Sequence, residues 1–352
     1  MTFLNSETAD YIRKLKTTLP EILLERHFQM QPELKTKYSE KQIKHYLEDT
    51  RFHLSYLSQA IESDEQVLFN DYLAWAKSSF KNLPVTDIEI ITNLKLLRDG
   101  LIENATPNVA NLISQYINKG IEYYINYDPY LESYIEYGNP FSEEAAKYLD
   151  FLVYGDKKSA QQLIMELVNN GATIKDIYTH IFQVTQKETG RLWQIGKINV
   201  AQEHLITAAT QLIMSLLYPY LFSTVNKGKK VLVACIEGEM HEIGARMVAD
   251  FFEMEGWNSY YVGANTPKNS LINTILSFKP DVIAISVTMV FNLSAVTELI
   301  NELKAIESLK NTKIIVGGYP FLIANNLWKT VGADGCGCDG KNAIVLADEL
   351  IN

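Results

Sequence analysis

A histidine and a carboxylate stand two positions apart, just beyond an apolar run with the composition of a buried strand. The run is residues 231–235, and the pair is Glu239 and His241, followed by Gly244. A neutral imidazole is a strong donor to a transition metal, and a carboxylate that accepts its other N–H fixes the tautomer. A glycine lets a bulky ligand approach the backbone. The loop predicts a metal-ligating histidine, although such a residue in isolation is more often a cap or a surface side chain.

Three later loops add hydroxyl groups and bare backbone. Ser286 and Thr288 follow one apolar run, and Gly317-Gly318 follows the next. The segment 262–267 closes another run. Taken with the histidine loop, they predict a deep slot lined by small and hydroxyl side chains, with an imidazole at its mouth. Each loop has an ordinary alternative, because Gly-Gly is often only a turn and Ser or Thr often only a helix cap.

These loops belong to a repeating pattern of short apolar runs and helices after residue 230. Strands are predicted at 231–235, 259–262, 282–287 and 313–316 and near Ala333, with helices that begin near Ile243, Pro267, Asn292, Pro320 and Asn342. Strands that alternate with helices form a parallel sheet, and ligands bind such a sheet at the carboxyl ends of its strands. The pattern predicts an α/β Rossmann-like (flavodoxin-like) domain over residues 228–352.

The chain before this domain is predicted to be almost wholly helical. From Ser39 to Phe80, apolar residues recur at three- and four-residue steps, and Pro84 stops the run. Residues 86–89 have the pattern of a capping box. Two prolines and a glycine within 128–140 predict a boundary there. We therefore expect an all-α N-terminal region over residues 1–138.

A second helical block follows that boundary. Its helices are predicted to begin at four capping residues, Ser142, Asp156, Thr173 and Asn199. Four helices with short connections make a small four-helix bundle. This bundle is predicted to span residues 139–226 and to lead directly into the sheet domain.

Composition and charge narrow the class of protein. The chain has 352 residues, 47% hydrophobic and 21% charged, which is typical of a globular protein. Its polar N-terminus and the lack of a long apolar stretch predict a cytoplasmic protein without a membrane span. A net charge of −10 disfavours direct binding to nucleic acid. Three cysteines cannot build a disulfide framework, and Cys336-Gly337-Cys338 has no second ligand pair for a metal site.

The loops of the sheet domain also carry a family resemblance. Seven residues, in chain order, resemble the motif of the B12-binding domain in methionine synthase, corrinoid carrier proteins and photoreceptors: Glu239, His241, Gly244, Ser286, Thr288, Gly317 and Gly318. The resemblance covers about residues 228–352. It implies that His241 replaces dimethylbenzimidazole beneath the cobalt of cobalamin, while the nucleotide tail threads into the sheet. The family motif begins with Asp, so Glu239 departs from it, and a longer carboxylate still reaches the imidazole.

A second set of residues lies in the bundle. Trp193 is followed after nine residues by Glu203-His204, and this set resembles the cap bundle of CarH-type photoreceptors. The resemblance implies an indole over the adenosyl group of adenosylcobalamin, with Glu203 and His204 bonded to that group. Gln194 departs from the family, where a histidine at this position captures cobalt after light has cleaved the cobalt–carbon bond. The alternative is that Trp193 is core and that Glu203 and His204 form a solvated helix face.

The N-terminal region contains polar and aromatic residues that could bind a flat pigment. Histidine, arginine, aspartate and several aromatic residues recur on consecutive helical turns in 49–56 and 69–75. The region loosely resembles the globin-like bilin-binding domain of photocobilins. Because it has no cysteine for a thioether link, the resemblance implies a non-covalent bilin such as biliverdin. The alternatives are a haem, or a dimerisation or signalling module whose aromatic residues form core.

The function expected from these features is that of an adenosylcobalamin-binding photoreceptor or signalling protein. Light would shift the bundle against the sheet domain, and the N-terminal region would report this through homo-oligomerisation or a signalling partner. One rival is a corrinoid carrier that passes methyl groups between methyltransferases, and another is a B12 sensor without a light response. The sequence shows no nucleophile–base pair, so we do not expect the protein itself to be an enzyme.

Overall fold

The computed structural model describes residues 2–81, 85–135, 138–221 and 226–351. By the density of internal contacts, the chain divides into two compact units. The first holds Met1–Pro129, Met289–Ser294 and Ile323–Thr330, and the second holds Tyr130–Thr288, Ala295–Leu322 and Val331–Asn352. The second unit therefore contains every residue selected above for a cobalamin site. The finer domain boundaries at residues 138 and 226 stay predictions.

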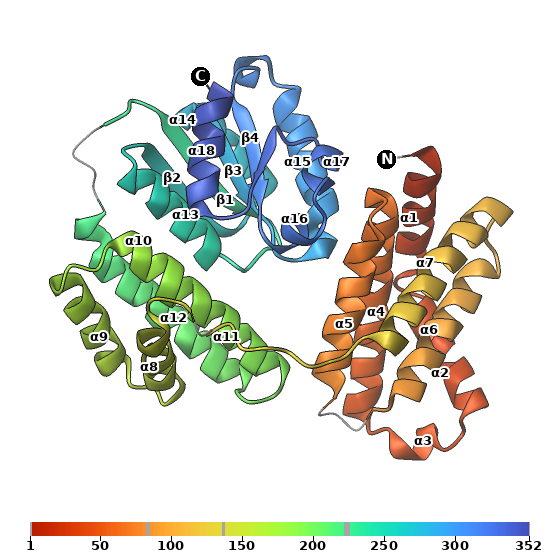
Figure 1. Ribbon diagram of the computed structural model, residues 1–352. Helices are drawn as coiled ribbons and strands as arrows, with labels where there is room; N and C mark the ends of the chain where they lie inside the picture. The colour runs from red at the N-terminus through yellow and green to blue at the C-terminus, as the bar shows by residue number, and fades with distance from the viewer. Residues whose placement is uncertain (1, 82–84, 136–137, 222–225, 352) are drawn as a thin grey trace. The chain divides into compact units, whose positions relative to one another are not determined.

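Helices build the N-terminal part of the first unit (Figure 1). They are α1 Phe3–Leu15, α2 Leu19–Met30, α3 Leu34–Lys37, α4 Glu40–Ser63, α5 Gln66–Phe80, α6 Asp87–Ile102 and α7 Pro107–Asn126. The apolar run from Ser39 to Phe80 forms two helices, because Asp64 takes a left-handed conformation with φ 57° that ends α4. Pro84, expected to stop the run, lies outside the described residues. The capping box is confirmed, since Thr86 and Glu89 each bond the other's backbone N–H.

A bundle of helices opens the second unit (Figure 1). Its elements are α8 Ser142–Val153, α9 Lys157–Asn169, α10 Ile174–Asp176, the π-helix η1 Ile177–Phe182, α11 Gln183–Gln194, α12 Val200–Leu217 and the 3₁₀ turn η2 Tyr218–Tyr220. Because α10, η1 and α11 follow one another without a break, the described residues 138–221 form four helical rods. The predicted four-helix bundle is confirmed.

The caps of these helices show how well local sequence signals locate helix starts. Asp156, Thr173 and Asn199 each accept a hydrogen bond from a backbone N–H in the first turn, as predicted. The prediction for Ser142 is wrong. Ser142 is the first residue of α8, and Phe141 holds the cap position without a side-chain hydrogen bond. The acidic first turn of α8 compensates, because carboxylates there favour the positive end of the helix dipole.

A parallel five-stranded sheet forms the rest of the second unit, in the order β2-β1-β3-β4-β5. The strands are β1 Lys230–Ile236, β2 Asn258–Thr266, β3 Val282–Ser286, β4 Lys313–Gly317 and β5 Gly335–Gly337. This is the flavodoxin-like strand order, so the predicted fold class is confirmed. The weak strand expected near Ala333 begins at Gly335. Strand β1 is buried on both faces, which explains its uninterrupted apolar sequence.

Helices connect the strands along the chain. They are α13 Ile243–Met254, α14 Lys268–Phe278, η3 Val290–Asn292, α15 Leu293–Lys304, η4 Glu307–Leu309, α16 Tyr319–Ile323, α17 Leu327–Thr330 and α18 Gly340–Ile351. Helices α13 and α18 contact each other and the strands beneath them. None of the helices in the described ranges is long and apolar enough to cross a membrane.

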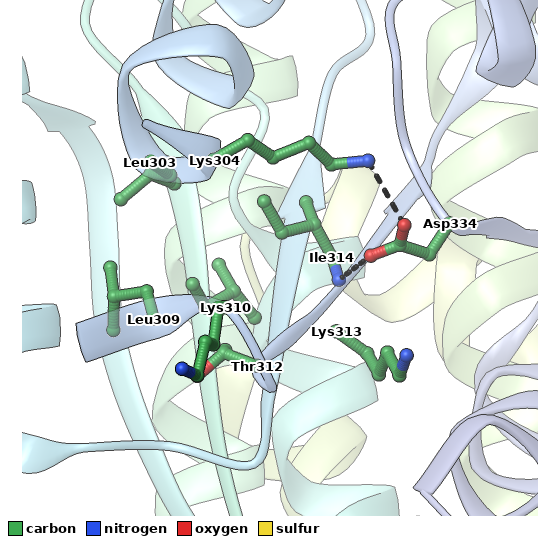
Figure 2. A pocket seen from close by; sticks show the side chains of 9 residues that line it. Leu303, Lys304, Leu309, Lys310, Thr312, Lys313, Ile314 and Asp334 are labelled. Carbon is green, nitrogen blue, oxygen red and sulfur yellow. Dashed lines mark hydrogen bonds and ion pairs between the residues drawn. The ribbon is translucent and has the colours of Figure 1, made fainter. Parts of the chain in front are cut away.

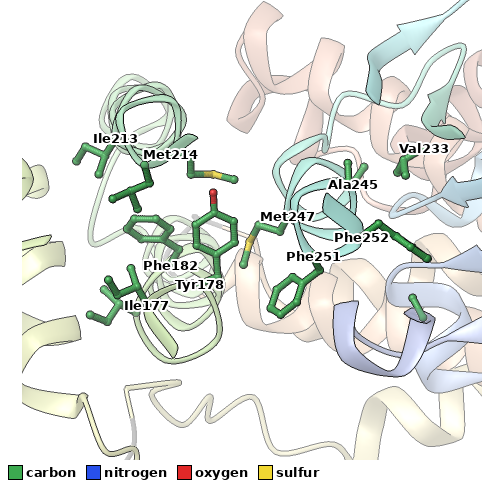
Figure 3. Packing of buried hydrophobic residues seen from close by; sticks show 14 of the residues in the cluster. Ile177, Tyr178, Phe182, Ile213, Met214, Val233, Ala245, Met247, Phe251 and Phe252 are labelled. Carbon is green, nitrogen blue, oxygen red and sulfur yellow. The ribbon is translucent and has the colours of Figure 1, made fainter. Parts of the chain in front are cut away.

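One apolar core runs from the bundle into the sheet domain (Figure 3). On the bundle side, Tyr178 and Met214 point toward Met247 and Phe251 of α13. The rings of Tyr178 and Phe251 meet edge to face, with centroids 6.2 Å apart. Buried apolar surface stabilises such a contact by roughly 25 cal/mol per Å². The core therefore holds α12 and η1 beside α13, the helix that follows the histidine loop.

Candidate functional site

The carboxyl ends of four strands lie side by side at one edge of the sheet. The strand register pairs Cys235 of β1 with Ser286 of β3, Ser286 with Gly317 of β4, and Gly317 with Gly337 of β5. The loops that carry the predicted site residues start at these positions. The topology therefore brings the histidine loop, Thr288 and the glycine pair to the same edge, as the sequence pattern indicated.

Glu239 and His241 form a closely coupled pair. Oε1 of Glu239 accepts a hydrogen bond from Nδ1 of His241 at 2.6 Å and another from its backbone N–H at 3.1 Å. Oε2 of the same carboxylate accepts from the backbone N–H of Thr288 at 2.9 Å. The Glu239 side chain is fully buried, whereas that of His241 is 57% exposed. With Nδ1 engaged, Nε2 is the ring nitrogen that remains for a metal.

The electrostatics of this pair favour a basic imidazole. The hydrogen bond to Glu239 raises the pKa of His241 above its ordinary value, while burial acts in the opposite direction. The negative charge of Glu239 adds to the increase, and so does that of Glu203 on the bundle. A histidine in such a field is a strong electron-pair donor once a cation replaces its proton. A hydrogen bond of 2.8 Å from Gln211 of α12 to Glu242 places this helix of the bundle beside the histidine loop.

Two residues that the sequence analysis did not select hold this loop in place. Asn265, in the left-handed region with φ 47°, donates its backbone N–H to the carbonyl of Glu239 at 2.9 Å. Its side-chain oxygen accepts from the backbone N–H of Gly238 at 2.8 Å. Glu242 bonds β2 through Tyr261, at 2.9 Å from its hydroxyl group. An asparagine near the end of a strand is a recognisable signal for a left-handed residue, but its partners in the histidine loop cannot be read from the sequence.

The glycines of the predicted slot differ in why the structure needs a residue without a side chain at each position. Gly318 has φ 108°, and a Cβ there would lie 1.9 Å from the carbonyl oxygen of Val287. A Cβ on Gly317 would lie 2.9 Å from the carbonyl oxygen of Gly337. The glycine pair is thus required by the packing of the chain itself. A Cβ on Gly244 would meet no atom within 4 Å, so the space beside this backbone is open to a ligand.

The bundle residues gather at the adjoining ends of α11 and α12. Trp193 lies in the last turn of α11 and is 41% exposed. Glu203 lies in the first turn of α12, where its Oε2 pairs with Nδ1 of His204 at 2.5 Å and its Oε1 accepts from Thr207 at 2.9 Å. The His204 side chain is 75% exposed. Trp193 is therefore not core, and Gln194 ends α11 beside it.

The cysteines follow the expectation of a chain without disulfides. Cys235, Cys336 and Cys338 are all free thiols. Burial raises the pKa of Cys235 to about 12, and that of Cys336 to about 11. Among the described residues, no group of three or more His, Cys, Asp or Glu side chains could hold a metal ion on its own.

A small cavity of about 280 Å³ lies elsewhere in the sheet domain (Figure 2). It is lined by residues from α15, η4 and the amino ends of β3 and β4, including Leu303, Lys310 and Lys313. Lys304 and Asp334 form an ion pair across it at 3.0 Å. The amino ends of the strands are opposite the loops described above. This cavity is therefore separate from the candidate site.

The aromatic cluster of the first unit is packed on itself. Nδ1 of His53 lies 2.7 Å from the hydroxyl group of Tyr72, and burial lowers the pKa of His53 to about 4. Tyr56 stacks on Tyr72 with ring centroids 4.0 Å apart, and the rings of Tyr72 and Trp75 stack with centroids 6.4 Å apart. Arg51 pairs with Glu21 at 2.6 Å. Four of the residues expected to hold a pigment, His53, Tyr56, Tyr72 and Trp75, thus form one cluster around Tyr72.

Comparison with known protein families adds a direct test of the resemblance. A profile of the B12 binding domain matches residues 229–347, which hold the sheet and all of its loops. A second B12 binding domain profile matches residues 144–218, which hold the bundle. B12-binding domains are present in this chain. The two matches together support cobalamin binding, and residues 1–143 lie outside both of them.

Several curated proteins are similar to parts of this chain. The trimethylamine corrinoid protein of Methanosarcina barkeri is 23% identical over 221 residues, which cover 60% of this chain and 97% of that protein. The HTH-type transcriptional repressor CarA of Myxococcus xanthus is 32% identical over 90 residues, which cover 26% of this chain and 31% of that protein. A corrinoid protein and a transcriptional repressor are therefore both among the similar proteins.

A solved structure confirms the architecture of the B12-binding part. The monomethylamine corrinoid protein of Methanosarcina barkeri superimposes with a TM-score of 0.52 at 21% identity. The match covers 59% of this chain and 99% of that structure. A helical bundle followed by a parallel five-stranded sheet is thus the fold that this chain shares with it.

Proposed function

We propose that this protein is an adenosylcobalamin-binding photoreceptor that signals through its N-terminal helical unit. One observation carries the proposal. Trp193 lies in the last turn of α11, Glu203 and His204 lie near the start of α12, and α12 is hydrogen-bonded through Gln211 to Glu242, the residue after His241. We infer that this end of the bundle would present an indole, a carboxylate and an imidazole toward the loop that would ligate cobalt.

The donor set on the sheet side fits the lower face of a cobalamin. Nε2 of His241 is the nitrogen that would ligate cobalt, because Glu239 holds Nδ1. The open space beside Gly244 gives the corrin room to approach the backbone. Ser286 and Thr288 would face the nucleotide tail, beside the backbone of Gly317 and Gly318.

The bundle side fits the upper face. Trp193 would pack its exposed indole against the adenine or ribose, since aromatic rings bury a large area at small entropic cost. Glu203 and His204 would bond the ribose hydroxyl groups, because both side chains keep polar atoms exposed. Bound adenosylcobalamin supplies a cobalt–carbon bond that visible light breaks. Trp193, Glu203 and His204 would hold the adenosyl group, and the loss of these contacts would change the preferred arrangement of the bundle–sheet interface.

The N-terminal unit is proposed as the output module, acting through self-association or a partner protein rather than through nucleic acid or a membrane. A non-covalent bilin such as biliverdin is proposed as a second pigment at the cluster of His53, Tyr56, Tyr72 and Trp75. Such a pigment must stack outside the His53–Tyr72 hydrogen bond or break it. The protein itself is proposed to catalyse no reaction, and its location is proposed to be the cytoplasm.

Reconstitution in darkness tests the proposal. The purified protein is loaded with adenosylcobalamin, and its absorption spectrum and oligomeric state are recorded before and after green light. We expect both to change after illumination, and we expect biliverdin to add its own absorption bands. An unchanged spectrum and oligomeric state would contradict light sensing, while a spectral change without a change in association would exclude self-association as the output and leave a partner protein.

A corrinoid methyl carrier is the second candidate, favoured by the two corrinoid proteins of Methanosarcina barkeri named above. A carrier must leave its upper face open to partner methyltransferases, so it should prefer methylcobalamin and tolerate the loss of Trp193. A B12 sensor without a light response is the third, and it predicts tight binding in the dark and no change on illumination. Equal affinity for the adenosyl and methyl forms would favour these candidates over the first.

A further inference from the structure

A polar stripe runs along one face of α12. Glu203, Thr207, Gln211 and Ser215 follow one another at four-residue steps, so they lie on the same side of the helix. At the upper end, Thr207 donates to Oε1 of Glu203 at 2.9 Å. At the lower end, Gln211 and Ser215 contact the first turns of α13. The stripe thus connects the predicted adenosyl contacts with the helix that begins two residues after His241.

Glu242 joins this stripe to the histidine loop. Its Oε1 accepts from Nε2 of Gln211 at 2.8 Å. Its Oε2 accepts from the hydroxyl group of Tyr261 at 2.9 Å and from the backbone N–H of Ala264 at 3.1 Å. One carboxylate therefore holds three groups, two on β2 and one on the bundle. Because Glu242 is bonded directly to His241 through the chain, any movement at Gln211 acts next to the predicted cobalt ligand.

Arg246 repeats the contact one turn further along α13. Its guanidinium group donates to the carbonyl oxygen of Gln211 at 3.2 Å and to the hydroxyl group of Ser215 at 2.8 Å. Glu242 and Arg246 are four residues apart on α13, and Gln211 and Ser215 are four apart on α12. Two matching helical turns thus bond each other through polar groups that are at most partly buried.

The other side of the same interface has a different character. Tyr178, in the π-helix η1, donates its buried hydroxyl group to Oδ2 of Asp250 at 2.8 Å. Around it, Met214, Met247 and Phe251 make apolar contacts (Figure 3). A buried apolar contact opens at a larger cost than partly exposed hydrogen bonds. The apolar side is therefore suited to stay closed while the polar side opens.

We propose that Glu242 is a positioning residue that latches the bundle to the His241 loop through Gln211, and that release of this latch lets the bundle lift from the cofactor. The inference rests on the proposed function for the identity of the ligand. Hydrogen bonds to a charged group are stronger than those between neutral groups when well formed, and they weaken when water reaches them. A contact of this strength holds the bundle closed and still opens within the energy of a typical coupling between sites.

Three variants test the latch. Gln211→Leu removes the donor to Glu242 and leaves the bonds from Glu242 to β2. Gln211→Lys replaces the amide by an ammonium group and strengthens the attraction to the carboxylate. Gln162→Leu, an exposed position on α9, is the matched control. Two quantities are measured in each variant: the dissociation rate of adenosylcobalamin in darkness, and hydrogen exchange of the α12 amides in the ligand-free protein.

The two Gln211 variants are expected to move these quantities in opposite directions. With Leu, the cofactor should dissociate about tenfold faster and the α12 amides after residue 207 should exchange faster, because the bundle opens more often. With Lys, both rates should equal or fall below those of the parent protein. The control should match the parent protein.

Two results would overturn the latch. Parent-like rates for Gln211→Leu would show that the contact carries no coupling, and equally faster rates for both Gln211 variants would assign Gln211 a packing role alone. If the parent protein fails to bind adenosylcobalamin, the proposed function is wrong. The exchange measurement on the ligand-free protein still decides whether the latch exists.

Discussion

The two sides of the candidate cobalamin site are built differently. On the sheet side, Glu239 is fully buried and accepts three hydrogen bonds, from the ring and backbone of His241 and from the backbone of Thr288. On the bundle side, Trp193 and His204 are both substantially exposed. On the sheet side, hydrogen bonds to a buried carboxylate hold the metal-ligating side chain in place. On the bundle side, the side chains are accessible to solvent.

This difference separates affinity from selectivity. A ligand atom held by a buried network is positioned before the cofactor arrives, which lowers the entropic cost of binding. Exposed side chains gain their order only with a matching group above the corrin. We therefore expect the sheet side to decide how tightly any cobalamin binds, and the bundle side to decide which upper ligand is preferred.

The largest effect is expected from His241→Ala, which removes the only side chain proposed to ligate cobalt. Affinity for cobalamin should fall roughly 100-fold or more, since even substitutions behind a metal ligand cost about 10–100-fold. Absorbance titration measures the dissociation constant, and the bound form of the variant should have the colour of a cobalamin without a histidine ligand. Unchanged affinity and colour would contradict the claim that the sheet side supplies the cobalt ligand and determines how tightly cobalamin binds.

A smaller loss is expected from Glu239→Gln. The amide can accept with one atom only, and its NH₂ group then faces an N–H donor of His241 or Thr288, which leaves a buried mismatch. Affinity should fall about 30-fold, within the range known for residues that orient a metal ligand. Glu237→Gln, an exposed carboxylate in the same loop, is the control and should bind as the parent protein does. Equal losses in both variants would show that net charge, rather than orientation, matters.

The junction between the two sides should respond to pH through Asp250. Burial raises the pKa of Asp250 to about 6, and the charge of Glu253 adds to the increase. The hydrogen bond from Tyr178 and the charge of Arg246 act in the opposite direction. The folded state therefore prefers the protonated carboxyl group of Asp250. Its contribution to the free energy of unfolding is complete below about pH 4 and is lost as the pH rises through about 6.

Asp250→Asn removes this ionisation and keeps an acceptor for Tyr178. The variant should be more stable than the parent protein by about 2 kcal/mol at pH 7.5, and the advantage should disappear near pH 4. Urea unfolding of the ligand-free protein followed by circular dichroism measures it. Asp150→Asn, an exposed aspartate on α8, is the matched control. A stability advantage of Asp250→Asn that does not vary with pH would contradict the claim that ionisation of Asp250 destabilises the folded protein.

The smallest effect is expected on the bundle side. Trp193→Ala should lower affinity for adenosylcobalamin about tenfold, the cost of an aromatic contact of some 1–1.5 kcal/mol. Affinity for methylcobalamin should not change, since a methyl group does not reach the indole. Trp75→Ala, an equally exposed tryptophan of the first unit, is the control. An equal loss for both cobalamins would remove the proposed role of the bundle in selectivity and favour the methyl-carrier function.

Much of the fold follows from local patterns. Apolar runs of strand length predicted the sheet and its order of elements, and Asp156, Thr173 and Asn199 marked helix starts. Ser142 was placed one position too late, because a polar residue at a helix start can serve either as the cap or as the first helical residue. The π-helix η1 left no local signal, since its geometry depends on what it packs against.

The site was predictable where its chemistry is local. Glu239 and His241 are two residues apart, so their contact could be inferred from the chain alone. The partners of Glu242 could not, because Gln211 and Tyr261 come from two other elements. The glycine pair was selected for closeness to a ligand, whereas Gly318 is required by the carbonyl group of Val287. Contacts across elements depend on tertiary packing, which a single sequence does not reveal.

The origin of the nitrogen beneath cobalt tests the central claim most directly. The protein is produced with ¹⁵N-labelled histidine, loaded with unlabelled cobalamin and reduced to the Co(II) form. Its electron paramagnetic resonance spectrum then reports which nucleus couples to the unpaired electron. Coordination by His241 predicts that each cobalt line splits into two in the labelled protein and into three in the unlabelled protein. A three-fold splitting in both would mean that benzimidazole stays on the metal, and it would contradict the account.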